Sequence, residues 1–112
     1  MKPKAYQQPA QLFHLLSHPA RLAILDELRR GEACVCHLQT ALQRPQAYVS
    51  QQLRVLRDAG LVADRKDGLL VYYRIAEPMV RQLLNQTLGP AGEWVPLDSC
   101  PCPKCSPEGT CR

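Results

Sequence analysis

The sequence has no apolar run that approaches the roughly 18 residues that a membrane-spanning helix requires. Residues 1–9 carry two lysines but lack the apolar stretch of a secretory signal. We therefore expect a cytoplasmic protein with no membrane partner. In that reducing compartment, its six cysteines indicate metal binding or redox sensing rather than a disulfide framework.

The motifs of common enzyme classes are missing as well. The chain has no glycine-rich phosphate loop and no constellation of acidic residues with histidine. The one nucleophile pair, Cys36 and His37, is adjacent in sequence, which is weak support for catalysis. We predict no catalytic residues, no organic cofactor and no enzyme activity.

A modest excess of positive charge is concentrated in one part of the chain. The 112 residues carry 14 Lys and Arg against 10 Asp and Glu, a formal net charge of +4. Between Arg44 and Arg74 lie six of the cations but only three carboxylates. A chain of this length forms one small domain, which buries about 65% of its unfolded surface, so oligomerisation would add stability.

Apolar periodicity, proline and glycine predict five helices and one β-hairpin. The expected helices cover residues 9–16, 19–30, 36–43, 46–59 and 77–88, and the expected strands cover residues 61–66 and 69–75 around a turn at Asp67-Gly68. Two short helices and then a charged hairpin indicate a winged helix-turn-helix, mainly α with a β-hairpin wing (α+β). We expect residues 1–8 to be a loose arm. Residues 1–88 would form the DNA-binding and dimerisation domain, and residues 89–112 a flexible tail rich in proline and cysteine.

The predicted helix over residues 46–59 is suited to the major groove of DNA. Val49, Leu53 and Leu56 recur on one face, which we expect to be buried. The other faces carry amide and basic groups, and glutamine can bond adenine at two points. Arg65 and Lys66 on the hairpin suit phosphate or minor-groove contacts. The predicted contacts to double-stranded operator DNA are Gln46, Ala47, Tyr48, Ser50, Gln51, Gln52, Arg54, Arg65 and Lys66.

The first and last predicted helices carry many apolar residues for a small domain. These are Leu12, Phe13, Leu16, Val80, Leu83 and Leu84. They either pack on the chain's own core or form the interface of a homodimer, and their number favours the homodimer.

Cys34 and Cys36 stand where the third predicted helix begins. Side chains two residues apart point in nearly opposite directions on a helix but in the same direction on an extended chain. If both sulfurs bind one ion, we expect the first turn of that helix to unwind and the DNA-reading helix to move with it. A helix N-terminus also stabilises the thiolate, the form that binds soft cations.

Four more cysteines gather in the tail, at Cys100, Cys102, Cys105 and Cys111. Three sulfurs suit As(III) or Sb(III), and four suit tetrahedral Zn(II) or Cd(II). Three arrangements remain open: the pair with a tail sulfur, a site within the tail, or no site. His37 could add a nitrogen ligand for zinc or cadmium. The predicted ligands are Cys34, Cys36, Cys100, Cys102 and Cys105, with As(III) or Sb(III) as inducer and Cd(II), Pb(II) or Zn(II) as alternatives.

Four segments together resemble the ArsR/SmtB metalloregulatory repressors over about residues 10–88. They are residues 16–22 (LSHPARL), 34–38 (CVCHL), 49–62 (VSQQLRVLRDAGLV), and 64–68 (DRKDG) with 71–74 (VYYR). The resemblance implies a homodimer, built through the first and last helices, that binds a two-fold operator and loses affinity when metal binds. It places the DNA-reading residues at Gln46, Ala47, Ser50, Gln51 and Gln52.

The chain departs from the family pattern at several positions. The family often has a third cysteine where this chain has Gln39, and an aspartate where it has His37, so the helix lacks a complete three-thiol arsenite site. Position 52 is often histidine in the family, which changes the expected base preference. Residues 79–88 lack the aspartate and histidine pairs of the family's zinc and nickel sensors. The third ligand is therefore expected from the tail.

The expected function is a metal(loid)-responsive transcriptional repressor that As(III), Sb(III) or a related soft metal releases from operator DNA. Two alternatives use the same residues. One is a thiol-based regulator that senses oxidants or persulfides. The other is a DNA-binding protein with a structural zinc in its tail.

Overall fold

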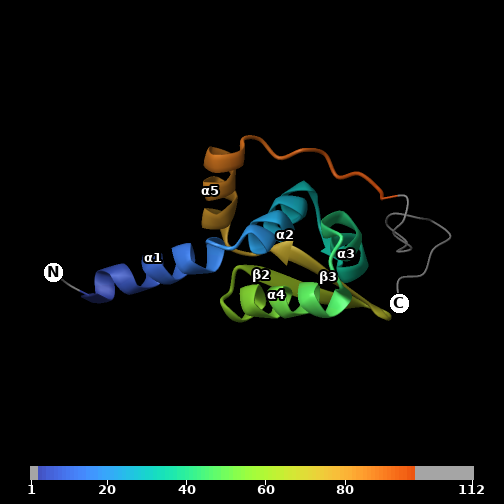
Figure 1. Ribbon diagram of the computed structural model, residues 1–112, viewed down its shortest axis with the longest axis horizontal. Coiled ribbons are helices and arrows are strands. Elements are labelled where there is room, and N and C mark those ends of the chain that lie inside the picture. The colour runs from blue at the N-terminus through green and yellow to red at the C-terminus, as the bar shows by residue number, and fades with distance from the viewer. Residues whose placement is uncertain (1–2, 98–112) are drawn as a thin grey trace.

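The computed structural model describes residues 3–97, which form five helices and a three-stranded sheet (Figure 1). The elements are α1 (Pro3–Leu16), α2 (Pro19–Arg30), β1 (Ala33–Cys34), α3 (Val35–Leu42), α4 (Gln46–Asp58), β2 (Val62–Asp67), β3 (Leu70–Ile75) and α5 (Pro78–Leu88). Helices α3 and α4 followed by the β2–β3 hairpin are the predicted winged helix-turn-helix.

The core lies where α2, α3 and α4 pack on one another and on the sheet. The predicted apolar face of α4 is confirmed, because Val49, Leu53 and Leu56 are all fully buried. Burial of one such side chain contributes about 1.5–3 kcal/mol, so this shared face holds α4 firmly against α2. The other fully buried aliphatic side chains are Ile24, Leu25, Leu28, Leu38, Val80 and Leu84.

Helix α1 is longer than the sequence pattern predicts and projects from the rest of the molecule (Figure 1). The prediction of a loose arm was wrong, because the helix begins at Pro3 and Pro9 lies inside it. An interior proline loses one backbone hydrogen bond and costs about 3 kcal/mol, which is why the pattern favoured a start at Pro9. At Pro3 the missing N–H has no partner within the helix to lose.

Strand β1 was not predicted from the sequence. It has two residues, too few for any periodic signal, and it pairs antiparallel with β3, so that the strand order is β1-β3-β2. The pairing satisfies backbone groups at the edge of β3 and sets Cys34 opposite Tyr72. The residues just before α3 are therefore anchored to the wing.

The wing turn lies one residue later than predicted. Asp67 pairs with Leu70, which leaves Gly68 and Leu69 as the connecting residues. Gly68 has φ +64°, a left-handed conformation that glycine adopts without steric cost. Leu69 is fully exposed at the tip of the wing.

Helix α5 ends where the sequence predicts and begins one residue later, at Pro78. The Glu77 side chain accepts a hydrogen bond from the backbone N–H of Met79, which caps the helix N-terminus. In the stretch from residue 3 to residue 97, no helix combines the length and the apolar character that a membrane crossing needs.

Candidate DNA interface and thiol site

The outer face of α4 presents polar side chains opposite its buried stripe. Gln46, Ala47, Gln51 and Arg54 are exposed, while Tyr48 and Ser50 are half-buried. The guanidinium of Arg44 lies 5.5 Å from the centre of the Tyr48 ring. The structure thus brings most of the predicted DNA-reading residues together on one open surface of α4.

Gln52 is not part of that surface, so the expectation that it faces DNA is wrong. Its exposed fraction is 7%, and its Oε1 accepts a hydrogen bond of 2.8 Å from Nε of Arg21. Arg21 also donates to the backbone carbonyl of Leu15. The pair ties α4 to the junction of α1 and α2, because position 52 lies between Val49 and Leu53 at the edge of the buried face.

Arg65 on the wing is engaged by a carboxylate. Its guanidinium donates three hydrogen bonds of 2.7 to 3.1 Å to Glu32, and the Glu32 carboxylate raises the pKa of Arg65. It also lies 4.9 Å from the centre of the Tyr72 ring. To contact DNA, Arg65 would have to exchange the Glu32 carboxylate for a phosphate. Lys66, on the same strand, is already exposed.

The sulfurs of Cys34 and Cys36 lie 2.8 Å apart. Cys34 is the N-cap of α3, with extended backbone angles (φ −85°, ψ 168°), and Cys36 lies in the first helical turn. Cys34 is 1% exposed and Cys36 is half-buried. The expectation that the helix must unwind before both sulfurs can converge is therefore wrong, because Cys34 lies just outside the helix.

The described part of the chain supplies two sulfurs and no further ligand. Between residues 3 and 97 no group of three or more histidine, cysteine, aspartate or glutamate side chains is arranged to hold a metal ion. Cys36 is disulfide-bonded, and its sulfur lies beside that of Cys34. The other predicted ligands, Cys100, Cys102 and Cys105, lie outside the described residues, as does Cys111.

His37 is a packed core residue and does not join the sulfurs. It is 1% exposed, its ring stacks on Trp94 with centroids 5.2 Å apart, and its Nε2 lies 3.3 Å from Oε2 of Glu27. The hydrogen bond with His37 lowers the pKa of Glu27 below its ordinary value. The suggestion that His37 supplies a nitrogen ligand is not supported by these contacts.

A line of three side chains joins the thiol pair to the wing. Cys34 pairs with Tyr72 across β1 and β3, and Tyr72 pairs with Arg65 across β3 and β2. Directly opposed residues of antiparallel strands project from the same face of the sheet. Sequence reasoning missed this line because it depends on strand β1.

A small cavity of about 120 Å³ adjoins the two sulfurs. Gln46 at the start of α4 lines it, as do Leu69, Leu70 and Val71 at the end of the wing. A group that filled this cavity would therefore lie beside the start of α4 and the end of the wing.

Comparison with known proteins identifies the class of protein. Residues 18–64 match the bacterial regulatory protein, arsR family. The chain is 41% identical over 80 residues to the transcriptional repressor SmtB homolog of Synechocystis, a match that covers 71% of this chain and 61% of the relative. It is 48% identical over 71 residues to the arsenical resistance operon repressor of Escherichia coli, which covers 61% of this chain and 59% of the relative.

A solved structure agrees with this assignment. The homodimeric winged helix-turn-helix DNA-binding domain of Mb0332 from Mycobacterium bovis superposes with a TM-score of 0.69 at 34% identity, covering 78% of this chain and 81% of that chain. The chain belongs to the ArsR/SmtB family of transcriptional regulators. The matches span about three-fifths of the length of the first curated relatives.

Proposed function

We propose that this protein is a transcriptional repressor that binds operator DNA as a homodimer and is released when a soft metal(loid) binds its thiolates. As(III) or Sb(III) is the favoured inducer, with Cd(II), Pb(II) and Zn(II) as alternatives. The proposed ligands are Cys34 and Cys36, with a tail sulfur from Cys100, Cys102 or Cys105 as the third. The relative named for arsenical resistance supports this choice of inducer.

The observation that carries the proposal is the sulfur pair itself. The two sulfurs lie 2.8 Å apart and need to separate by only about 1 Å to reach the roughly 3.8 Å between two thiolates on a tetrahedral zinc ion with bonds of about 2.3 Å. Both sit at the N-terminus of α3, where the helix dipole stabilises thiolates. Reduction of Cys36 must precede binding, because the thiolate is the ligand.

Release of DNA follows from where the pair lies. An ion at the sulfurs would lie against Tyr72, and the ring of Tyr72 contacts the guanidinium of Arg65. The same ion would adjoin the cavity lined by Gln46 and by the end of the wing. We therefore propose that the ligand acts on α4 and the wing directly, with α3 remaining helical.

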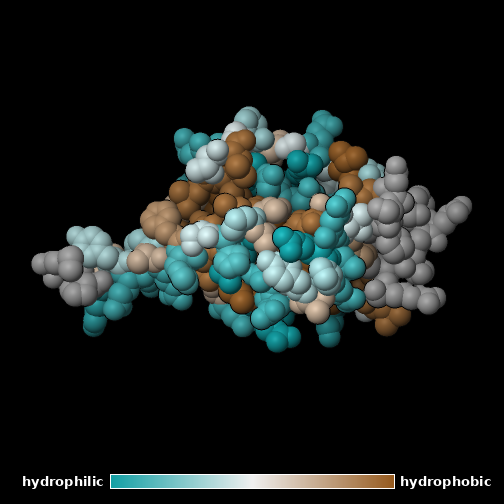
Figure 2. Space-filling view, viewed as in Figure 1, coloured by the Kyte–Doolittle hydropathy of each residue, from teal (hydrophilic) through white to brown (hydrophobic). Residues whose placement is uncertain are grey.

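The proposed dimer surface lies between α1 and α5. Half of the residues predicted for the interface are already buried in the chain's own core, namely Leu16, Val80 and Leu84. Phe13 and Met79 remain 58% and 47% exposed, and they line a groove of about 620 Å³ together with Leu12 and Leu83. Figure 2 shows hydrophobic side chains gathered over this junction, which supports burial against a second copy.

Arsenite titration against a protein–operator complex tests the proposal. With fully reduced protein we expect fluorescence anisotropy of labelled operator to fall as arsenite is added, and Cys34→Ser and Cys36→Ser to abolish the fall while preserving DNA binding. Anisotropy that stays constant at saturating arsenite would sink the proposed inducer. Parallel titrations with Cd(II), Pb(II) and Zn(II) rank the alternatives.

A thiol redox sensor is the second candidate. The disulfide bond at Cys36 and the close approach of the two sulfurs favour it. Release of DNA by diamide or polysulfide in metal-free buffer, together with no response to any metal(loid), would replace the metal sensor with this function.

A further inference from the structure

The short segment that joins α2 to the thiol pair also holds the wing. Glu32 lies two residues before Cys34, between the end of α2 and strand β1. Its carboxylate reaches β2 and accepts three hydrogen bonds from Nε and Nη2 of Arg65. One stretch of chain therefore carries both a proposed ligand and the residue that engages the wing cation.

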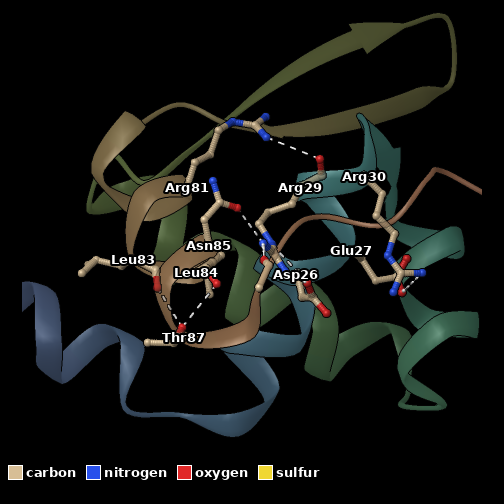
Figure 3. Close-up of polar contacts among 10 residues, drawn as sticks. Asp26, Glu27, Arg29, Arg30, Arg81, Leu83, Leu84, Asn85 and Thr87 are labelled. Atoms are coloured by element: carbon tan, nitrogen blue, oxygen red, sulfur yellow. Dashed lines mark hydrogen bonds and ion pairs between the residues drawn. The ribbon is translucent and has the colours of Figure 1, made fainter.

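The α2 end of this segment is fixed. The guanidinium of Arg29 is buried and donates hydrogen bonds of 2.8 Å to Oδ1 of Asn85 and 2.7 Å to the Gly89 carbonyl. Asp26 pairs with the same guanidinium, and Arg81 of α5 donates to the Arg29 backbone carbonyl. Figure 3 shows Arg29 directed from α2 towards Asn85, and Arg81 directed from α5 back towards the end of α2. A buried guanidinium requires such acceptors, so the last turn of α2 is held against α5.

The other end of the segment is the part that an ion would restrain. Cys34 lies in the two-residue strand β1, whereas Cys36 lies in the first turn of α3. Bonds from one ion to both sulfurs would cross-link β1 to that turn. Because the α2 end is already fixed, residues 31–33 would then lose conformational freedom between two fixed ends.

The guanidinium of Arg65 cannot offer the same edge to Glu32 and to DNA. The edge formed by Nε and Nη2 faces Glu32, and a phosphate is bound best through two parallel N–H groups of this kind. The side chains of Arg65 and Glu32 are 49% and 26% exposed, so operator DNA can reach the pair and the pair is weak enough to exchange. The firmness with which Glu32 is held therefore affects how readily Arg65 transfers to phosphate.

We propose that Glu32 is a positioning residue for Arg65, and that it competes with operator phosphate more strongly when an ion occupies Cys34 and Cys36. In the ligand-free protein, residues 31–33 can adjust, so Glu32 gives up the guanidinium when the wing meets DNA. An ion that ties Cys34 to α3 removes that freedom, and the wing loses a phosphate contact. This inference rests on the proposed function and specifies how occupation of the site reaches the wing.

Replacement of Glu32 tests its part in release. With fully reduced protein, saturating arsenite weakens operator binding by some factor, and we expect Glu32→Gln to lower that factor at least about fivefold. Direct titration of the DNA-free variant with arsenite should give the wild-type affinity. Asp67→Asn is the matched control, because it removes the same charge at a carboxylate 3.8 Å from Arg65 and should keep the wild-type factor.

Two results of this comparison would overturn the inference. One is a Glu32→Gln protein that arsenite releases by the wild-type factor, and the other is an Asp67→Asn protein that loses as much of the response as Glu32→Gln. Both leave the proposed function standing. A wild-type homodimer that responds to no metal(loid) removes the proposed function, and this inference with it.

Hydrogen exchange at Nε–H of Arg65 provides a readout without DNA. We expect arsenite to slow this exchange at least about fivefold in the reduced wild type, because the Glu32 acceptor is held more firmly, and to leave it unchanged in Glu32→Gln. A purely structural role for Glu32 would change the urea midpoint and not the response of this proton to arsenite. Nuclear magnetic resonance measures the exchange, and an equal rate with and without arsenite in the wild type would contradict the inference.

Discussion

At the scale of single residues, neighbouring glutamines on α4 have different roles. Gln51 is exposed on the outer face, whereas Gln52 is buried and accepts the hydrogen bond from Arg21. The two side chains have the same chemistry, so their different environments determine what each contributes.

The two glutamines should therefore separate stability from DNA binding. We expect Gln52→Ala to lower the free energy of unfolding by about 1.5–3 kcal/mol, because it removes a hydrogen bond to a charged group. Gln51→Ala should leave stability within about 0.5 kcal/mol and weaken operator binding by about 1–3 kcal/mol. Urea unfolding and anisotropy titration measure the two effects, and the reverse assignment would contradict the structure.

Glu27 should contribute to the pH dependence of stability. Its pKa is lowered in the folded protein by the hydrogen bond with His37, so its contribution is complete above the unfolded value of 4.5 and is lost as pH falls through the lower folded pKa. We expect Glu27→Gln to flatten the loss of stability below about pH 4.5. Urea unfolding at a series of acidic pH values checks this, and parallel curves for both proteins would contradict it.

At the scale of elements, the connecting residues determine how the helices and the wing are oriented relative to one another. Gly60 joins α4 to β2 with φ +80°, and a Cβ built there would meet nothing within 4 Å. Gly60 lies just past the end of α4, the position where glycine commonly ends a helix in the left-handed conformation.

Substitution of Gly60 should destabilise the fold through backbone strain and not through a steric clash. We expect Gly60→Ala to lower the free energy of unfolding by about 1–2 kcal/mol, the cost of a left-handed conformation for an L-residue. Gly92→Ala is the control: it has no left-handed angle, and its Cβ would lie 3.4 Å from Nε of Arg30. Denaturant midpoints of the two variants make the comparison, and equal midpoints would argue against strain at Gly60.

The Glu32 carboxylate should reduce the positive charge that the wing presents to DNA, because it pairs with Arg65. Glu32→Gln removes the carboxylate that pairs with Arg65, so we expect tighter operator binding and a steeper salt dependence, by about one counterion. Lys66→Ala should make the slope shallower by about one. Affinity measured across a salt series gives both slopes. A Glu32→Gln slope equal to wild type would mean that Arg65 does not meet phosphate.

At the scale of the whole molecule, α1 and α5 leave an apolar groove that no other described residue of the chain fills. Phe13 lies on this groove and is more than half exposed. Phe13 therefore contributes little to the folding free energy of a single chain.

Phe13→Glu should act on assembly and not on folding. We expect the dimer dissociation constant to rise at least about tenfold, because a charge would be buried at the interface. The helix content should not change, because the side chain is exposed in the single chain. Sedimentation velocity over a range of concentrations measures the shift, with Leu69→Glu at the fully exposed wing tip as the control. Identical sedimentation of Phe13→Glu and wild type would rule out this groove as the interface.

The amino-acid sequence by itself determined the helices α2 to α5, the hairpin and the buried face of α4. Each of these depends on local periodicity or on turn chemistry, as in the burial of Val49, Leu53 and Leu56 and in the capping of α5 by Glu77. It also predicted that Cys34 and Cys36 act together, because they lie only two positions apart in the sequence.

Only the tertiary structure decided how those parts meet. Strand β1 exists because β3 offers it a backbone edge, and through it Cys34, Tyr72 and Arg65 align across the sheet. Gln52 and His37 became core residues because Arg21, Glu27 and Trp94 reach them from distant parts of the chain. These contacts join residues far apart in sequence, and no local pattern records them.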